Sequence, residues 1–364
     1  AESRGVPVAV SQLVGFEGGK GFAGGSIVCG PGEGVVHRSV LWDEALDVVR
    51  VEVPRAPRPR ADAGPPILES EPAEALERGL GPALPPADRA RDPAILEVDA
   101  DLVEDWLVRF LRDEMTRRRG FERAVVGMSG GVDSSVTAAL CARAFGPASV
   151  HGFLMPYATS SPESAEHAGL VAEQLGIETR TVEITDAVDG YLEGFEPEAG
   201  PTRRGNVMAR MRMIVLFDQA AKLGALPVGT GNKSERLLGY FTWHADDSPP
   251  INPLGDLFKT QVWALARHLG LPEAVIDKPA TADLVRGQTD ESDLGVSYGE
   301  ADLILLHLVE GRTPEWLEAA GFDREHIRTV RRRLEGTHWK RNLPTVAMLS
   351  STTIGEWYLR PVDY

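Results

Sequence analysis

Hydrophobic and polar positions follow two periods through most of the chain. Short apolar runs, typical of buried strands, alternate with longer segments whose apolar positions recur at helical spacing. We expect strands at 124–128, 150–156, 177–182 and 225–232, and helices at 102–112, 136–145, 162–176 and 204–224. This alternation predicts an α/β fold built on a doubly wound parallel sheet. The ligand site of such a sheet lies at the carboxyl ends of its strands.

The beginning of the chain has a different pattern. Short apolar stretches separated by glycine pairs predict a small β-rich piece at 1–54. Its strands are expected at 6–10, 26–29, 34–37 and 45–53. Ten prolines then fall between residues 54 and 93, so we expect an extended linker at 55–98. The α/β domain is therefore expected at 99–364.

Composition narrows the classes of function. A net charge of −16 disfavours long-range attraction to nucleic acid or to anionic membranes, so neither is expected as a partner. Cys29 and Cys141 are the two cysteines, and their separation argues against a disulfide framework or a cysteine zinc site. The sequence shows neither the apolar run of about 18 residues that a membrane helix needs nor a signal-peptide pattern. We therefore expect a cytoplasmic enzyme.

The loop after the strand at 124–128 reads Ser-Gly-Gly-Val-Asp-Ser-Ser, at positions 129–135. Gly130 and Gly131 let backbone amides approach a ligand, and the free N–H groups at a helix start form a site for phosphate. Asp133 repels an anion, so its natural use is to hold a metal that rides on the phosphates. Hydroxyl donors come from Ser129, Ser134 and Ser135. The alternative is an ordinary glycine turn between a strand and a helix.

This loop differs from the two common nucleotide loops, since it has neither the Lys-Ser or Lys-Thr pair of one nor the glycine spacing of the other. It resembles the pyrophosphate loop of the ATP pyrophosphatase family, whose fold is adenine-nucleotide α-hydrolase-like. The resemblance implies that ATP is cut between its α and β phosphates and that an adenylated intermediate forms. The loop alone would suit a GMP synthetase or a tRNA thiolation enzyme equally well.

Four later stretches narrow the choice. They cover 204–213, 229–235, 251–260, and 278–284 together with 289–295. Thr230 at a strand end and Glu235 five residues later can bracket a metal–triphosphate, and Lys259 at a helix start can face phosphates. Taken singly, each stretch also has an ordinary structural explanation, such as a surface position on an amphipathic helix for Arg210.

In this order, the loop and the four stretches resemble the NAD synthetase family from about residue 100 to 345. The resemblance implies a homodimeric ligase that forms a C–N bond, converting deamido-NAD to NAD with ATP, Mg²⁺ and ammonia and releasing AMP and pyrophosphate. It implies that Asp133, Lys259 and Asp246 act in catalysis. The implied ATP contacts are Ser129, Gly130, Gly131, Ser134, Ser135, Thr230, Lys259 and Ser292. The implied metal ligands are Asp133 and Glu235, and the implied deamido-NAD contacts are Arg210, Asp246, Lys340 and Arg341.

A second resemblance concerns the source of nitrogen. Residues 22–36 resemble the last strands of a nitrilase-like glutaminase domain, and the Glu, Lys and Cys of that domain lie upstream of such a segment. Cys29 sits in an apolar strand and is expected to be a core thiol. The resemblance thus implies a glutaminase remnant and ammonia as the donor. Glutamine would serve only with a glutaminase supplied by a separate chain.

The sequence departs from the ammonia-dependent pattern at two places. The strand after the phosphate loop ends at 154–157 in Leu-Met-Pro-Tyr, which resembles the glutamine-dependent branch. Near the end of the chain, Trp339 stands where the family has a histidine, with His338 one position earlier.

Two other functions fit the same loops. One is another ATP pyrophosphatase amidotransferase such as GMP synthetase, which would consume xanthosine monophosphate. The other is a nucleotide-binding protein without turnover, which would bind ATP but release no pyrophosphate. The presence of Asp133, Glu235 and Lys259 together favours an enzyme.

Overall fold

The computed structural model describes residues 8–10, 14–17, 20–23, 26–30, 34–39, 49, 51, 87–281, 289–342, 347 and 349. The chain forms two compact units, residues 1–84 and 85–364, and this boundary falls inside the segment expected to be a linker. The strand expected at 45–53 lies outside the described residues except for Val49 and Val51, which belong to no strand. The proposed division at residues 54 and 98 therefore stays a prediction.

The first unit contains two small antiparallel sheets. One is ordered β1-β4-β5, and its strands are β1 (Val8–Val10), β4 (Ile27–Gly30) and β5 (Gly34–Arg38). The other pairs β2 (Val14–Glu17) with β3 (Lys20–Ala23), two strands that the pattern did not predict. Glu17 pairs with Lys20, and the two residues between them in the sequence are glycines, as is typical of tight hairpins. Cys29 is a free, half-buried thiol in β4.

The second unit is built on a parallel sheet in the order β8-β7-β6-β9, which confirms the doubly wound α/β prediction. Its strands are β6 (Ala124–Gly127), β7 (Val150–Leu154), β8 (Glu178–Thr181) and β9 (Leu226–Pro227). The expectation of a strand over 225–232 was too long. The pairing with β6 ends at Pro227 and the Val228 amide, which donates to the Val125 carbonyl at 3.0 Å, and Val228 forms an isolated bridge with Ile251 before the loop begins.

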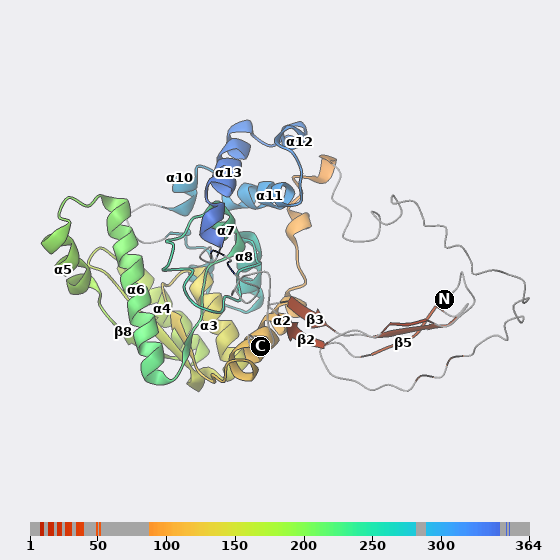
Figure 1. The fold of residues 1–364 in the computed structure, drawn as a ribbon, viewed down its shortest axis with the longest axis horizontal. Helices are drawn as coiled ribbons and strands as arrows, with labels where there is room; N and C mark the ends of the chain where they lie inside the picture. The colour runs from red at the N-terminus through yellow and green to blue at the C-terminus, as the bar shows by residue number, and fades with distance from the viewer. Residues whose placement is uncertain are drawn as a thin grey trace, which may run out of the picture. The chain divides into compact units, whose positions relative to one another are not determined.

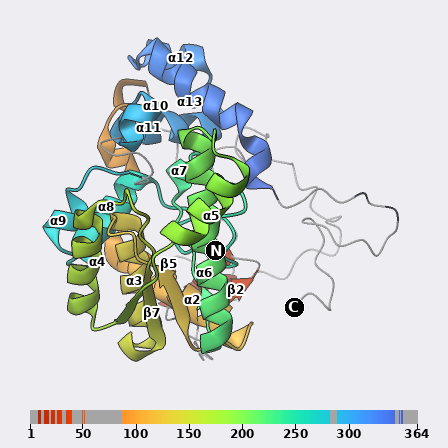
Figure 2. The same ribbon diagram turned by 90° about the vertical axis from the view of Figure 1, so that its left-hand side faces the viewer.

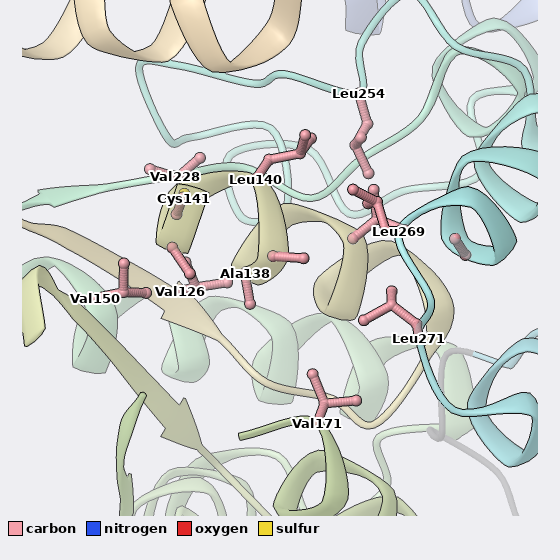
Figure 3. Packing of buried hydrophobic residues seen from close by; sticks show 14 of the residues in the cluster. Val126, Ala138, Leu140, Cys141, Val150, Val171, Val228, Leu254, Leu269 and Leu271 are labelled. Carbon is pink, nitrogen blue, oxygen red and sulfur yellow. The ribbon is translucent and has the colours of Figure 1, made fainter. Parts of the chain in front are cut away.

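Helices cover both faces of this sheet (Figure 2). They are α3 (Val132–Phe145), α4 (Pro162–Leu175), α5 (Thr185–Phe195) and α6 (Pro201–Leu223). Side chains on a strand alternate between faces, so Val126 packs in the core with α3 and α4, whereas Val125 packs with α5 and α6. Figure 3 shows Val126 near Ala138 of α3 in the first of these cores. The loops at the strand ends are therefore anchored to a sheet whose two faces are both packed against helices.

Three further helices pack with α3 in the core of the sheet. They are α2 (Ala100–Arg112), α8 (Lys259–His268) and α9 (Glu273–Ile276). The other helices lie beside the strand ends (Figure 1). They are α7 (Lys233–Leu238), α10 (Asp290–Leu294), α11 (Tyr298–Val309), α12 (Pro314–Ala319) and α13 (Arg324–Gly336). Single turns are η2 (Ala87–Arg89), η3 (Pro93–Leu96), η4 (Asp113–Arg117), η5 (Pro147–Ser149) and η6 (His338–Arg341).

The helices α10 to α13 have a core of their own, which includes Ile304 and Val330. Ala90 and Leu96 are buried in it, so the last part of the expected linker packs against these helices and is not extended. None of the helices in the described part of the chain combines the length and the apolar character that crossing a membrane requires.

Candidate active site

Two loops meet at the point where the strand order reverses. The chain runs outward from β6 to β7 and β8, then returns to place β9 on the other side of β6. The crevice between the loops after β6 and β9 is the place where open α/β sheets bind ligands. The loops are joined directly, because the Asn232 side-chain amide donates a hydrogen bond to Asp133 Oδ1 at 2.9 Å.

Gly130 shapes the loop after β6. Its φ is +72°, and a Cβ at this position would lie 2.0 Å from the Ser164 carbonyl oxygen near the start of α4. Gly131 is the N-cap residue of α3 and offers no side-chain cap. The first amides of α3 therefore remain for a ligand at the positive end of the helix dipole, as a phosphate loop requires.

The loop hydroxyls divide into two groups. Ser129 is exposed and its Oγ lies 3.1 Å from Ser134 Oγ, which donates to the Gly131 carbonyl. Ser135 is fully buried, and its hydroxyl donates to the Gly131 carbonyl at 2.8 Å. This local bond to the preceding turn uses the Ser135 hydroxyl inside α3, and the expected contact of Ser135 with ATP stays a prediction.

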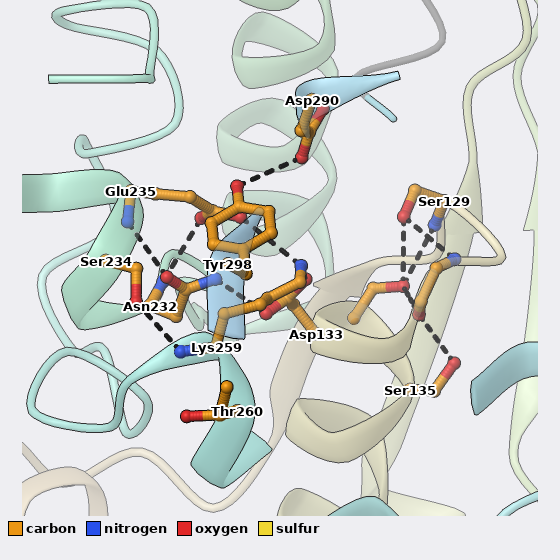
Figure 4. Close-up of polar contacts among 12 residues, drawn as sticks. Ser129, Asp133, Ser135, Asn232, Ser234, Glu235, Lys259, Thr260, Asp290 and Tyr298 are labelled. Atoms are coloured by element: carbon orange, nitrogen blue, oxygen red, sulfur yellow. Dashed lines mark hydrogen bonds and ion pairs between the residues drawn. The ribbon is translucent and has the colours of Figure 1, made fainter. Parts of the chain in front are cut away.

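Lys259 stands at the centre of the site, as Figure 4 shows. It is the first residue of α8, and its side chain is 2% exposed. Its ammonium group forms an ion pair with Asp133 and lies 3.5 Å from Glu235 Oε1. The structure therefore brings together three of the predicted residues from three different elements: α3, α7 and α8.

The charges in this cluster are unequal, since several carboxylates surround a single ammonium. Burial and the neighbouring Asp133 raise the pKa of Glu235 above its ordinary value. Burial alone would lower the pKa of Lys259, but the carboxylates of Asp133 and Glu235 outweigh it and raise the pKa. Burial also raises the pKa of Asp290, although Lys259 and the Tyr298 hydroxyl oppose that rise. The site thus has excess negative charge, which an added cation would neutralise.

The donor set suits a magnesium ion that travels with phosphates. Among the described residues, no group of three or more His, Cys, Asp or Glu side chains could hold a metal alone. Asp133 and Glu235 supply two carboxylates beside the phosphate loop. Mg²⁺ is commonly held by one or two carboxylates plus substrate phosphates and water, so these two residues fit it.

Three residues of the cluster were not predicted as site residues. Asn232 caps α7, and its capping box with Glu235 could have been found from the Asn-x-x-Glu spacing. Asp290 and Tyr298 are also buried here, where the Tyr298 hydroxyl donates to Asp290 Oδ2 at 3.2 Å. Asp290 Oδ1 is buried without a hydrogen-bond partner in the described part of the chain. Nothing in the local sequence distinguishes Asp290 from an ordinary helix-start acid.

The residues expected on the deamido-NAD side gather around the loop between α7 and β-bridge residue Ile251. Arg210 of α6 donates to the Trp243 carbonyl at 3.0 Å, and its side chain is exposed. Asp246 accepts from the Thr242 amide at 2.7 Å. Loss of hydration beside neighbouring protein atoms raises the pKa of Asp246, and the hydrogen bond from the Thr242 amide opposes that rise.

The side chains of Lys340 and Arg341 both donate hydrogen bonds to backbone carbonyls of this chain. Lys340 Nζ donates to the carbonyls of Gly239 and Phe241, at 2.8 and 2.7 Å. Arg341 donates to the carbonyls of Leu237 at the end of α7 and Leu334 in α13. Cations at a helix carboxyl end satisfy unpaired carbonyls and complement the helix dipole. The positive charge of Lys340 acts on the Asp246 carboxylate and lowers its pKa. The Arg341 guanidinium instead caps the carboxyl end of α7.

Two predicted ATP contacts lie apart from this network. Thr230 is half-buried in the loop after β9, and its hydroxyl makes no hydrogen bond to the residues that the structure describes. Ser292 is exposed in the first turn of α10, where its hydroxyl donates to the Thr289 carbonyl at 2.7 Å. Its hydroxyl is thus occupied by the capping turn that begins α10.

Comparisons with known proteins agree with this geometry. The chain is 48% identical over 261 residues to the NH(3)-dependent NAD(+) synthetase of Trichlorobacter lovleyi, covering 71% of this chain and 94% of the relative. The solved structure of the NMN synthetase of Francisella tularensis matches with a TM-score of 0.62 and 29% identity. The match covers 69% of this chain and 99% of the Francisella tularensis chain. A glutamine-dependent NAD⁺ synthetase from Acinetobacter baumannii, at 23% identity and a TM-score of 0.61, covers 95% of this chain and 60% of its own length, which shows a shared fold. The NAD synthase family model matches residues 103–344. The chain therefore belongs to the NAD synthase family.

Proposed function

We propose that this chain amidates deamido-NAD to NAD with ATP and ammonia. The observation that supports this proposal most strongly is the buried Lys259, which lies between Asp133 and Glu235 at the reversal point of the sheet. A buried ammonium beside a phosphate loop can neutralise a leaving pyrophosphate, and the two carboxylates suit a metal that accompanies ATP. The named activity of the relatives points to the same reaction.

The chemistry proceeds in two steps. A nicotinate carboxylate oxygen attacks the α-phosphorus of ATP, the bond to pyrophosphate breaks, and an NAD-adenylate forms. Ammonia then attacks the activated carbonyl carbon, and the carbon–oxygen bond to AMP breaks. A covalent enzyme intermediate is not needed, so the protein acts by positioning its substrates and neutralising charge.

Each protein group has one task in this scheme. Amides of the α3 amino terminus, with Ser129 and Thr230, bind the phosphates, and Lys259 takes up charge on the departing pyrophosphate. Asp133 and Glu235 would hold Mg²⁺, which would supply further charge neutralisation beside the phosphates. Burial and Asp133 raise the pKa of Glu235, so a bound cation would compete with a proton for this carboxylate and bring its pKa back down.

The deamido-NAD side consists of Arg210, Asp246 and Lys340. Asp246 orients ammonia or accepts a proton from the attacking nitrogen, a task that suits a carboxylate whose pKa is raised. Arg210 and Lys340 provide positive charge for the substrate pyrophosphate or carboxylate. Arg210 and Lys340 would have to leave their present carbonyl partners to bind substrate. Arg341 is a weaker candidate for substrate contact, because its guanidinium donates to carbonyls of both α7 and α13.

Ammonia is the proposed nitrogen donor, and a second copy of the chain is the proposed partner. The exposed aromatic and aliphatic side chains of α5 and α6 support a homodimer, since large exposed apolar groups on neighbouring helices are typical of an interface. Glutamine would then require a separate glutaminase.

Product analysis tests the reaction. The full chain is incubated with deamido-NAD, Mg-ATP and either ammonium or glutamine, and products are separated by chromatography. NAD and AMP from ammonium alone are the expected result. NAD from glutamine would overturn the choice of nitrogen donor. Absence of NAD from both donors would overturn the proposal, and parallel assays for NMN and GMP formation would then identify a different acceptor.

A further inference from the structure

The helix that carries Lys259 has no side-chain acceptor of its own for its first two amides, although its Gln261 side chain accepts the Phe258 amide at 2.8 Å. Its N-cap residue is Phe258, whose side chain has no oxygen to accept the first amides of α8. The acceptors come from other helices. The Lys259 amide donates to Ser234 Oγ of α7 at 2.9 Å, and the Thr260 amide donates to Asp302 Oδ2 of α11 at 3.0 Å. Side chains of α7 and α11 therefore fix the start of α8.

Asp302 is the group that unites these contacts. Its carboxylate also accepts the Thr260 hydroxyl at 2.9 Å and the Ser234 hydroxyl at 2.5 Å. Both Asp302 and Ser234 are completely buried. One carboxylate in α11 thus fixes the first turn of α8 and, through Ser234, the first turn of α7. These two turns carry Lys259 and Glu235.

From this arrangement we propose that Asp302 is a positioning residue for the ATP-cleaving step. It holds the α8 start so that the Lys259 ammonium stays between Asp133 and Glu235, and it does this without touching substrate. The inference rests on the proposed role of Lys259 at the leaving pyrophosphate. A misplacement of about 1 Å in such a group can cost about 100-fold in rate.

The chemistry of the site supports a positional role over a stabilising one. A buried carboxylate is costly to fold, and a well-packed apolar side chain would stabilise the same place at least as well. A carboxylate can, however, accept three hydrogen bonds at once and favours the positive end of the α8 dipole. Its value therefore lies in the geometry that it imposes on α7 and α8.

The first test replaces Asp302 by Asn in the full chain. Asp302→Asn keeps the size of the side chain but puts an N–H donor where a second acceptor stood. We expect kcat for NAD formation to fall by about 10- to 100-fold, with the KM for deamido-NAD unchanged and the thermal midpoint at pH 8 not lowered. An unchanged kcat would overturn the proposal.

A matched pair at Thr260 keeps the test valid if Asp302→Asn does not fold. Thr260→Val removes the hydroxyl that donates to Asp302 and keeps the shape, whereas Thr260→Ser keeps the hydroxyl. We expect Thr260→Val to lower kcat several-fold and Thr260→Ser to retain it. Equal activity of the two variants would overturn the role of this contact.

A double-mutant cycle separates this inference from the proposed function. Lys259→Met alone should lower kcat by about 100- to 1,000-fold if Lys259 serves the leaving group. Adding Asp302→Asn to Lys259→Met should then cause a smaller further loss than Asp302→Asn causes in the natural chain, because one of the two positioned groups is already gone. Losses that multiply would overturn the positioning role of Asp302. Full activity of Lys259→Met would instead overturn the proposed role of Lys259.

Discussion

Gly130 shows how strongly one residue can be constrained by its surroundings. It combines a positive φ with a close approach to the Ser164 backbone, so any side chain is excluded both by conformation and by space. Gly120 has the same φ of +72° but nothing within 4 Å of its added Cβ. It therefore isolates the conformational cost from the steric cost.

We expect Gly130→Ala to abolish most activity and to destabilise the chain by more than about 2 kcal/mol. Gly120→Ala should cost about 1 kcal/mol and leave activity unchanged, since it bears the strain of a positive φ alone. Chemical denaturation and NAD formation measured on both variants test this. Equal destabilisation by the two changes would contradict the steric argument.

Asp133 is the residue on which the metal proposal depends. Asp133→Ala removes a partner of Lys259 and of Asn232, along with the proposed Mg²⁺ ligand. We expect AMP release to fall by about 100-fold or more while the circular dichroism spectrum stays native. Asp256→Ala is the control, because Asp256 pairs with Lys233 in an exposed setting. Retained activity of Asp133→Ala would refute its role as a metal ligand.

Asp302 should also leave a signature in the pH dependence of stability. Burial raises its pKa from 3.8 to about 6, although bonds from Ser234 and Thr260 oppose the rise. Between these values the folded chain keeps a proton that the unfolded chain has lost, so this group makes stability fall as pH rises. Lys259, the charged group that acts on Asp302, stays protonated throughout.

Asp302→Asn removes this titration. We expect the free energy of unfolding of the variant, relative to the natural chain, to increase from pH 4 to pH 7 by up to about 3 kcal/mol. Urea denaturation of the ligand-free chain at both pH values measures the difference. A constant difference between the two proteins would show that Asp302 does not titrate in this range.

At the scale of elements, the periodic segments were predictable and the contacts between them were not. The helix expected at 204–224 is found at Pro201–Leu223, the strand expected at 150–156 is found at Val150–Leu154, and Lys259 begins a helix as expected. The ion pair of Lys259 with Asp133 joins residues that are 126 positions apart. No local pattern encodes such a distance, so only the family resemblance could suggest it.

The same limit explains the residues that were missed, and it bears on Ser135. Asp290 and Asp302 lie on helices whose sequences show only ordinary acidic positions, and their burial depends on how α10 and α11 pack. Ser135 was expected to bind ATP because the loop motif contains it, but its place in the first full turn of α3 directs its hydroxyl to Gly131. Sequence identifies the chemistry available in a motif, whereas helix geometry selects the side chains that face the ligand.

The η6 turn gives a prediction at this scale. Arg341 in η6 joins the end of α7 to α13 through carbonyls of Leu237 and Leu334, which would lose their partner in Arg341→Ala. We expect this variant to lower the free energy of unfolding by about 1–3 kcal/mol, with little change in the KM for deamido-NAD. Arg328→Ala, at an exposed position of α13, is the control. A large rise in KM with unchanged stability would restore Arg341 as a substrate contact.

At the scale of the whole molecule, α5 and α6 carry an apolar face that this chain alone leaves in water. Phe195 is 76% exposed and Ile214 60% exposed, and Tyr191 and Phe217 are also exposed on the same pair of helices. Figure 1 shows α5 and α6 packed beside each other within the second unit. Such a group of large apolar side chains is typical of an interface between copies of one chain.

We expect the chain to be a dimer in light-scattering measurements and Phe195→Asp to be a monomer, because a charge in an apolar contact would have to be buried unpaired. Val309→Asp is the control, since Val309 is 46% exposed on α11, away from this face. If Phe195→Asp remains dimeric, the interface lies elsewhere. If the natural chain is a monomer, the homodimer proposal fails.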